Sequence, residues 1–172
     1  HETMLIAGKQ GVWQFVRSTG RMEPLALPQE MQRKDNIYGT FIDTDRTLWV
    51  FSIIDECICR YSVGGKIIKE MLRLPSEGTD ESKNNAIRDM MDDGQGNVWI
   101  ATDHKGIFIY HKPTGEITHI EGARSKGQGA SIPSQSLSSN NVISLAKDRQ
   151  GTVWAGHFKT GISYWGASSR MF

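Results

Sequence analysis

The sequence lacks the features that mark membrane-spanning and nucleic-acid-binding proteins. Its 172 residues contain no apolar run of about eighteen residues, the length that a transmembrane helix needs. Basic and acidic side chains number 20 and 19, for a formal net charge of +1. Binding to nucleic acid or to an anionic membrane requires clustered positive charge, so we expect neither partner. No signal peptide is visible, but the chain begins with His1, so that absence carries no conclusion.

Cysteine and proline are also scarce, with two and five residues. Cys57 and Cys59 lie two positions apart in an apolar stretch, so on a strand they would share one face, poorly placed to bridge. We expect buried thiols rather than a disulfide or a metal site, which needs more ligands. By contrast, 18 glycines and five tryptophans favour a chain of many turns and few helices.

A repeat becomes visible when the sequence is aligned on tryptophan. Counting back from Trp99 and from Trp154, both segments have Asn at −14, an aliphatic residue at −12, Asp at −6, Gly at −3 and Val at −1. Both also have Gly at +7, followed by a third short apolar run. A weaker copy is centred on Trp49, with Arg46 in place of the first Gly and Glu56-Cys57 near the second. A truncated copy begins at Leu5, which occupies the Trp position.

A period of about 40–50 residues made of strands and turns is typical of β-propeller blades. Each unit divides into four short apolar segments separated by turn residues, as in an antiparallel meander. We therefore predict an all-β chain, a β-propeller fragment of about four blades of four-stranded antiparallel sheets. The blade units are expected roughly at 1–30, 31–76, 77–121 and 135–172. The first blade lacks its first strand, so the chain is interpreted as part of a larger ring.

The repeated polar residues have structural explanations. Asp at −6 and Gly at −3 form the turn between the first two strands, because Asp can bond the backbone two residues on and Gly accepts positive φ. The repeated Trp is expected to be a wedge between neighbouring blades, with its N–H on a backbone carbonyl. None of these aspartates is taken as catalytic because it recurs.

A ligand is expected at the loops that join the second and third strands, which share a face with the connections between blades. Loops on a rigid scaffold are where binding residues collect. The alternative is that these are ordinary exposed loop residues, and that His157 is a packed, hydrogen-bonded one. The long segment 121–139 is either a flexible linker or a lid. The candidate ligand-binding residues are Asp103, His104, Lys105, His157, Phe158 and Lys159.

Motifs for chemistry are missing. The sequence has no Gly-x-Ser-x-Gly elbow, no His-Glu-x-x-His and no phosphate-binding Gly-x-x-x-x-Gly-Lys loop. We therefore predict no catalytic residue, no metal ligand and no cofactor in this segment.

The residues 136–145, then Asp148–Gly156, then Gly161–Trp165, resemble the two-component regulator propeller repeat. The resemblance implies the periplasmic sensor region of a hybrid two-component system, the extracytoplasmic part of an inner-membrane receptor. It further implies an oligosaccharide ligand, the rest of the receptor propeller as a partner, and a homodimeric parent. Any histidine kinase activity would belong to the parent.

Two other functions stay open. Streptogramin lyases also fold as propellers with similar Gly- and Trp-bearing repeats, and such an enzyme would need a His as acid or base with polar partners near it. A protein–protein interaction scaffold is the other alternative.

Overall fold

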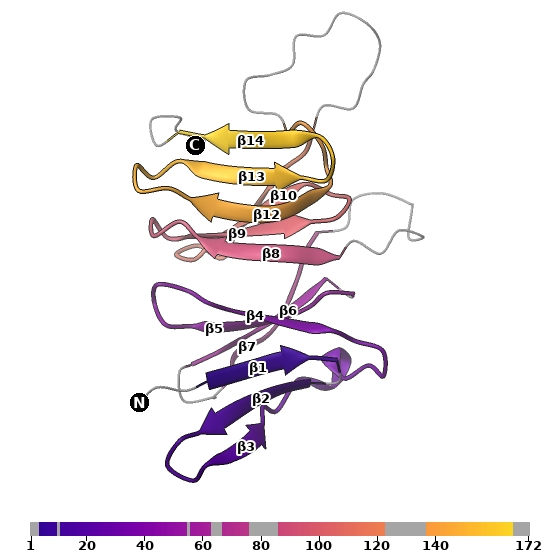
Figure 1. Cartoon of the computed structure of the whole chain (residues 1–172), viewed down its shortest axis with the longest axis vertical. Helices are drawn as coiled ribbons and strands as arrows, with labels where there is room; N and C mark the ends of the chain where they lie inside the picture. The colour runs from indigo at the N-terminus through magenta and orange to yellow at the C-terminus, as the bar shows by residue number, and fades with distance from the viewer. Residues whose placement is uncertain are drawn as a thin grey trace, which may run out of the picture. The chain divides into compact units, whose positions relative to one another are not determined.

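The structure is a computed structural model of the chain, which describes residues 4–9, 11–54, 56–62, 67–75, 86–122 and 137–166 (Figure 1). In these ranges the secondary structure is β-strand, apart from one short 3-10 helix, η1 (Gln29–Met31). The chain divides into an N-terminal unit, His1–Ala86, and a C-terminal unit, Ile87–Phe172.

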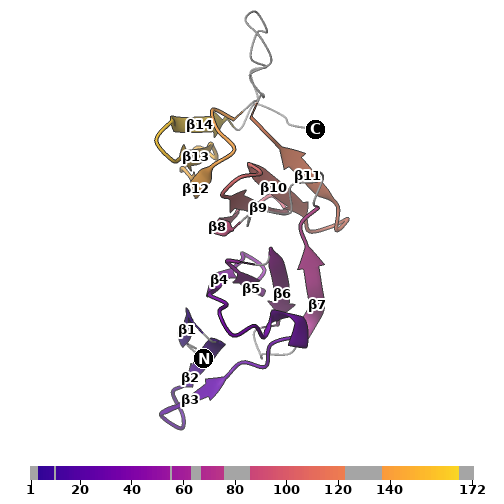
Figure 2. The ribbon, with the colours of Figure 1, turned by 90° about the vertical axis from the view of Figure 1, so that its right-hand side faces the viewer.

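The N-terminal unit contains two antiparallel sheets whose strands pair in chain order (Figure 2). The first sheet has three strands: β1 (Met4–Gly8), β2 (Gly11–Val16) and β3 (Arg21–Pro24). The second has four: β4 (Tyr38–Ile42), β5 (Leu48–Ser52), β6 (Cys57–Tyr61) and β7 (Ile67–Arg73).

The C-terminal unit repeats the same arrangement. Its four-stranded sheet consists of β8 (Ile87–Asp92), β9 (Asn97–Thr102), β10 (Ile107–His111) and β11 (Ile117–Ile120). Its three-stranded sheet consists of β12 (Val142–Lys147), β13 (Val153–His157) and β14 (Gly161–Trp165). Every pair of neighbouring strands is antiparallel.

These four sheets confirm the prediction of an all-β propeller fragment, including a first blade that is one strand short. The boundaries expected for the blade units stay a prediction. Most of the long segment expected at 121–139 lies outside the described residues, as does 76–85.

Each unit has its own apolar core. In the N-terminal unit the core includes both cysteines, which are buried on β6 and form no disulfide, as expected. The core of the C-terminal unit joins its two sheets, and the indole rings of Trp99 and Trp165 lie 5.4 Å apart between them. Trp99 therefore packs between sheets, as the repeat predicted.

The hydrogen bond of the repeated Trp differs from the expectation. Instead of a backbone carbonyl, the indole N–H bonds the carboxylate of the Asp six residues earlier. The distances from Nε1 to Oδ2 are 2.9 Å for Trp49 and Asp43, 3.2 Å for Trp99 and Asp93, and 3.0 Å for Trp154 and Asp148. The strand register explains the contact: Trp99 pairs with Met91, so Asp93, which directly follows the adjacent strand β8, lies diagonally across from Trp99.

The second carboxylate oxygen of each Asp holds the turn. Oδ1 accepts the backbone N–H two residues before the Trp, at 2.8 Å from Thr47, 3.1 Å from Asn97 and 2.8 Å from Thr152. At Asp148 such bonds favour the charged carboxylate. Accordingly, the indole of Trp154, with smaller effects from backbone N–H groups, lowers the pKa of Asp148 below its usual value. The recurring Asp is thus a structural residue.

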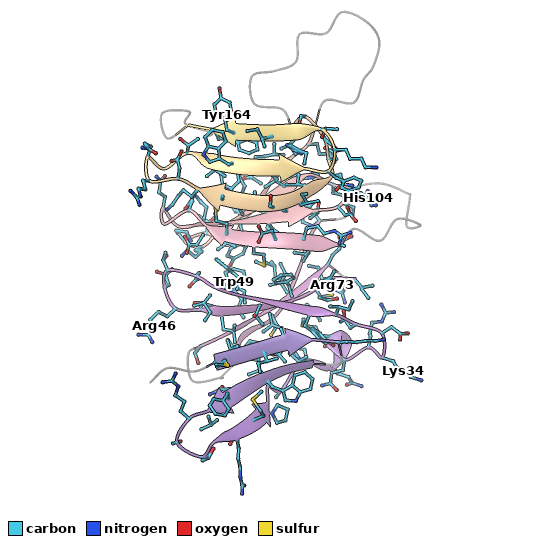
Figure 3. The ribbon with its side chains drawn as sticks, viewed as in Figure 1. Lys34, Arg46, Trp49, Arg73, His104 and Tyr164 are labelled. Atoms are coloured by element: carbon cyan, nitrogen blue, oxygen red, sulfur yellow. The ribbon has the colours of Figure 1, made fainter. Side chains whose placement is uncertain are left out.

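Arg46 occupies a turn position where the other units have glycine. Its φ is 62°, in the left-handed region that Gly96 (φ 95°) and Gly151 (φ 85°) also adopt. The side chain is exposed at the β4–β5 turn (Figure 3). Arg46→Gly removes the strain of a side chain at positive φ but adds freedom to the unfolded chain.

We expect Arg46→Gly to raise the free energy of unfolding by about 0.5–1 kcal/mol, as the difference between those two effects. Urea denaturation measures the change. The matched reverse substitution, Gly96→Ala, should destabilise by a similar amount, about 0.5–1 kcal/mol. A loss of stability in Arg46→Gly would show that the side chain makes contacts that outweigh its strain.

Candidate functional site

The first predicted loop is the tight turn between β9 and β10, which includes Asp103, His104 and Lys105. Thr102 closes it: its backbone N and its Oγ1 both donate to the carbonyl of Gly106, at 3.0 and 2.9 Å. Gly106 has a φ of +73° and lets the chain turn directly into β10. His104 is exposed at this end of the sheet (Figure 3).

Two side chains from neighbouring strands support this turn. Arg88, on β8, forms an ion pair with Asp103, whose side chain is only 16% exposed. His119, on β11, places Nε2 2.5 Å from the carbonyl oxygen of Lys105, so this nitrogen carries the proton. The His119 ring also stacks on Phe108 with the ring centroids 4.1 Å apart. The turn is therefore held in one shape before any ligand arrives.

The second predicted loop joins β13 to β14 and begins at His157. This residue is 5% exposed, and its Nε2 lies 2.8 Å from Ser163 Oγ. Burial lowers the pKa of His157, and the backbone carbonyls of Ser139 and Asn141 offset part of that effect. The imidazole is thus kept neutral near pH 7 and lies inside the loop.

Phe158 and Lys159 lie at the tip of that loop. The Phe158 ring is 52% exposed, and Lys159 Nζ lies 4.9 Å from its centroid, in a cation–π contact. Lys159 has a φ of 64°, a conformation that favours glycine or asparagine. Lys159 thus occupies an exposed turn position of the same kind as Arg46, whose φ is 62°.

The connection that precedes β12 holds both loops. Asn140 accepts the N–H of Gly106 on its carbonyl at 2.9 Å, and the next carbonyl, of Asn141, accepts the N–H of Phe158 at 3.1 Å. The side chain of Asn140 also accepts the N–H of Gly122 at 2.6 Å. Because consecutive residues bond the two loops, the loops lie next to each other at one end of the C-terminal unit.

The structure thus gives the six predicted residues different environments. His104, Phe158 and Lys159 are exposed, Lys105 is half-buried, Asp103 is paired with Arg88 and His157 is buried. Whether they contact a ligand stays a prediction. Sequence reasoning missed the supporting residues Arg88, His119, Asn140 and Asn141, although Asn at −14 was already visible as part of the repeat.

The described ranges lack the features of two other kinds of site. No three His, Cys, Asp or Glu side chains there gather closely enough to hold a metal ion. No helix there has the length and apolar character to cross a bilayer.

Successive antiparallel meanders with an Asp–Trp bond at the same position define the class of this chain, a β-propeller segment. The family described as two component regulator propeller matches residues 81–104 and 136–159. The resemblance to this repeat is thereby confirmed in both sheets of the C-terminal unit. A comparison with curated protein sequences finds no match.

Solved structures share the fold across nearly the whole chain. Two extracellular domains of hybrid two component systems from B. thetaiotaomicron align over 95% and 99% of it, with TM-scores of 0.71 and 0.67 and identities of 23% and 19%. Virginiamycin B lyase from Staphylococcus aureus aligns over 95%, with a TM-score of 0.59 and 14% identity. The chain covers 20% of each two-component neighbour and 55% of the lyase, and at these identities the likeness is one of fold.

Proposed function

We propose that this chain is a ligand-binding, non-enzymatic segment of the sensor region of a two-component signalling receptor. The observation that carries the proposal is the match of residues 81–104 and 136–159 to the two component regulator propeller. The fold shared with extracellular domains of hybrid two component systems supports it. A periplasmic location, a histidine kinase elsewhere in the parent and a homodimeric parent belong to the same proposal.

The proposed ligand is an oligosaccharide bound at the loops that Asn140 and Asn141 hold together. An exposed aromatic ring such as Phe158 offers an apolar face on which a sugar ring can stack. Lys159 and His104 supply donors for hydroxyl oxygens around it. Because the loops are already braced, little conformational entropy is lost on binding.

Three of the four histidines in the described ranges are held in hydrogen bonds, and the fourth, His104, is exposed; these bonds favour binding over a lyase-like activity. His111 Nδ1 lies 2.8 Å from Asn97 Oδ1, and its Nε2 lies 2.7 Å from Thr118 Oγ1. His119 is engaged with a backbone carbonyl and His157 with a buried hydroxyl. These rings serve as structural hydrogen-bonding groups rather than as an exposed acid or base.

Calorimetric titration of the chain with neutral hexasaccharides from α-glucan, β-glucan, mannan and galactan tests the proposal. We expect at least one to bind, and Phe158→Ala to weaken that binding by about tenfold, equivalent to about 1.4 kcal/mol. Lys159→Gly should weaken it as well while raising the melting temperature, because glycine relieves the strain at positive φ. If Lys159→Gly binds the saccharide more weakly while its melting temperature rises, the lysine has a binding role rather than a structural one.

The matched control is Arg149→Ala, in the exposed turn at the other end of β13. It removes a cation from the same sheet and should leave the affinity unchanged. Binding that is equal in all variants, or no binding of any hexasaccharide, would contradict the proposed ligand site.

A further inference from the structure

The three-stranded sheet of the C-terminal unit is apolar on both of its faces. On one face, Val153, Ala155 and Trp165 belong to the core that joins this sheet to the four-stranded sheet of the same unit. Because side chains alternate along a strand, the positions between them point to the other face. That second face, which we call the Trp154 face, consists of Trp154, Gly156, Ile162 and Tyr164.

The Trp154 face repeats, position by position, a face that is buried inside the C-terminal unit. On the four-stranded sheet, the same places in the repeat are occupied by Trp99, Ala101, Ile107 and Ile109. The strand registers agree, since Trp99 pairs with Ile109 as Trp154 pairs with Tyr164. Those four side chains are covered by the neighbouring sheet. By contrast, Ile162 and Tyr164 are 63% and 64% exposed, and Tyr164 extends outward from the unit (Figure 3).

The three-stranded sheet of the N-terminal unit exposes an apolar face of the opposite kind. Leu5, Ala7 and Val12 pack in the core of that unit, so the alternate strand positions point the other way. Paired positions on its three strands form this face, which we call the Phe15 face: Met4, Ile6, Phe15 and Met22. Three of these side chains are exposed and Phe15 is half-buried.

Phe15 occupies the position that Trp165 has in the C-terminal unit. Met4 pairs with Phe15 as Val153 pairs with Trp165, and both Met4 and Val153 directly precede the Trp position of the repeat. Trp165 is the ring that packs 5.4 Å from Trp99 between two sheets. The chain therefore carries both halves of this contact a second time, on the Trp154 face and on the Phe15 face, and both are exposed.

Exposed apolar side chains are concentrated on these two faces. Of the nine large hydrophobic side chains that are exposed in the described ranges, five belong to them. None of the residues that form either face is charged. An antiparallel sheet with one face in water normally alternates apolar and polar residues, and contiguous exposed apolar residues mark a protein interface. The two faces therefore fit burial against another sheet rather than exposure to solvent.

We propose that copies of this chain associate head to tail, with the Trp154 face of one copy against the Phe15 face of the next. Phe15 of one copy then lies beside Trp154 of the other, as Trp165 lies beside Trp99 within the C-terminal unit. Because the two faces differ, the interface is heterologous, and one face of each copy in a pair stays free unless the assembly closes into a ring. This inference does not rest on the ligand-binding function proposed above.

Sedimentation velocity of the chain between about 1 and about 200 µM tests the association, since this range covers a Kd of about 10 µM. We expect the weight-average mass to rise above that of one chain as the concentration increases. Because the contact is apolar, association should persist when sodium chloride is raised from about 0.1 M to about 1 M. A chain that stays monomeric throughout would overturn the proposal and would favour further sheets of a longer protein as the occupants of these faces.

Two double variants each block one face. Ile162→Lys with Tyr164→Lys places two charges on the Trp154 face, and Met4→Lys with Ile6→Lys does the same on the Phe15 face. Each should weaken association at least about tenfold, because a buried unpaired charge is costly. All four side chains are exposed in the single chain, so the variants should retain its melting temperature. The matched control is Ile42→Lys, which changes an exposed apolar residue of β4 outside both faces and should leave association unchanged.

Mixing the two double variants distinguishes head-to-tail association from contact between like faces. One variant retains an intact Phe15 face and the other an intact Trp154 face, so an equimolar mixture should form dimers and nothing larger. Dimers of either double variant alone would indicate contact between like faces, and a mixture that stays monomeric would contradict the proposed pairing. Phe158→Ala should leave association intact, so failure of the loop site and failure of this interface are separate results.

Discussion

Replacing Gly106 with Ala is expected to lower the free energy of unfolding by about 2–5 kcal/mol, as the sum of backbone strain and steric overlap. Gly106 has a φ of +73°, where a side chain is strained. A Cβ atom there would lie 2.3 Å from the carbonyl oxygen of Ile120 and 2.7 Å from Leu137 Cδ1. The carbonyl belongs to strand β11, so it cannot move without disturbing the sheet.

Gly161→Ala is the matched control for this prediction. Gly161 follows Trp154 by the same interval as Gly106 follows Trp99, and its φ is +92°. A Cβ atom on Gly161 would meet no atom within 4 Å. This variant should therefore be destabilised only by backbone strain, by about 0.5–1 kcal/mol once the lower entropy of its unfolded chain is subtracted. Guanidinium denaturation of both variants measures the difference, and equal losses would show that the sheet yields to the added methyl group.

The strand order of this chain was predictable because the repeat carries both an apolar pattern and its turn chemistry. Asp at −6 and Gly at −3 mark each turn, and the observed strands begin and end within a few residues of the expected ones. Even the departures in the Trp49 unit keep the backbone of the repeat. Arg46 and Glu56 adopt φ values of 62° and 54°, as the glycines of the other units do.

The direction of the Trp N–H and the environment of His157 were not predictable in the same way. An offset of six residues does not tell which strand positions face each other, and only the pairing of Trp99 with Met91 brings Asp93 to the indole. His157 directly follows Gly156 and precedes two exposed residues, so its position in the sequence does not tell whether its side chain is buried or exposed. Its contact with Ser163 depends on the β13–β14 register, in which His157 pairs with Gly161.

A cleft of about 590 Å³ in the N-terminal unit, lined by Trp13, Arg33 and Lys34 among other residues, was not predictable from the sequence for a related reason. Trp13 lies in the truncated unit, eight positions after Leu5, where the repeat has lost its Trp anchor. Arg33 and Lys34 lie in a connection without a repeat pattern. The sequence separates them from Trp13 by a full strand and a turn, and only the fold places all three around one volume.

Trp99→Ala is expected to cost about 3–5 kcal/mol of unfolding free energy, the usual range for deleting a buried aromatic side chain. Trp99 is 5% exposed, packs on Trp165 and lies in the core that joins the two sheets of the C-terminal unit. The substitution leaves a cavity between sheets and removes one hydrogen bond from the Asp93 carboxylate. Chemical denaturation followed by far-UV circular dichroism measures the loss without relying on the deleted fluorophore.

Trp154→Ala separates burial from the hydrogen bond. Trp154 donates to Asp148 in the same way, at 3.0 Å, but its ring is only half-buried and lies 5.3 Å from the ring of Tyr164, which is 64% exposed. This variant loses the same kind of bond and much less buried surface, so we expect a cost of about 1–2 kcal/mol. If the two variants are equally destabilised, the Asp–Trp bond rather than packing between sheets is the main contribution of the repeated tryptophan. If Trp99→Ala loses much more unfolding free energy than Trp154→Ala, the main contribution of the repeated Trp is a large apolar side chain packed between neighbouring sheets.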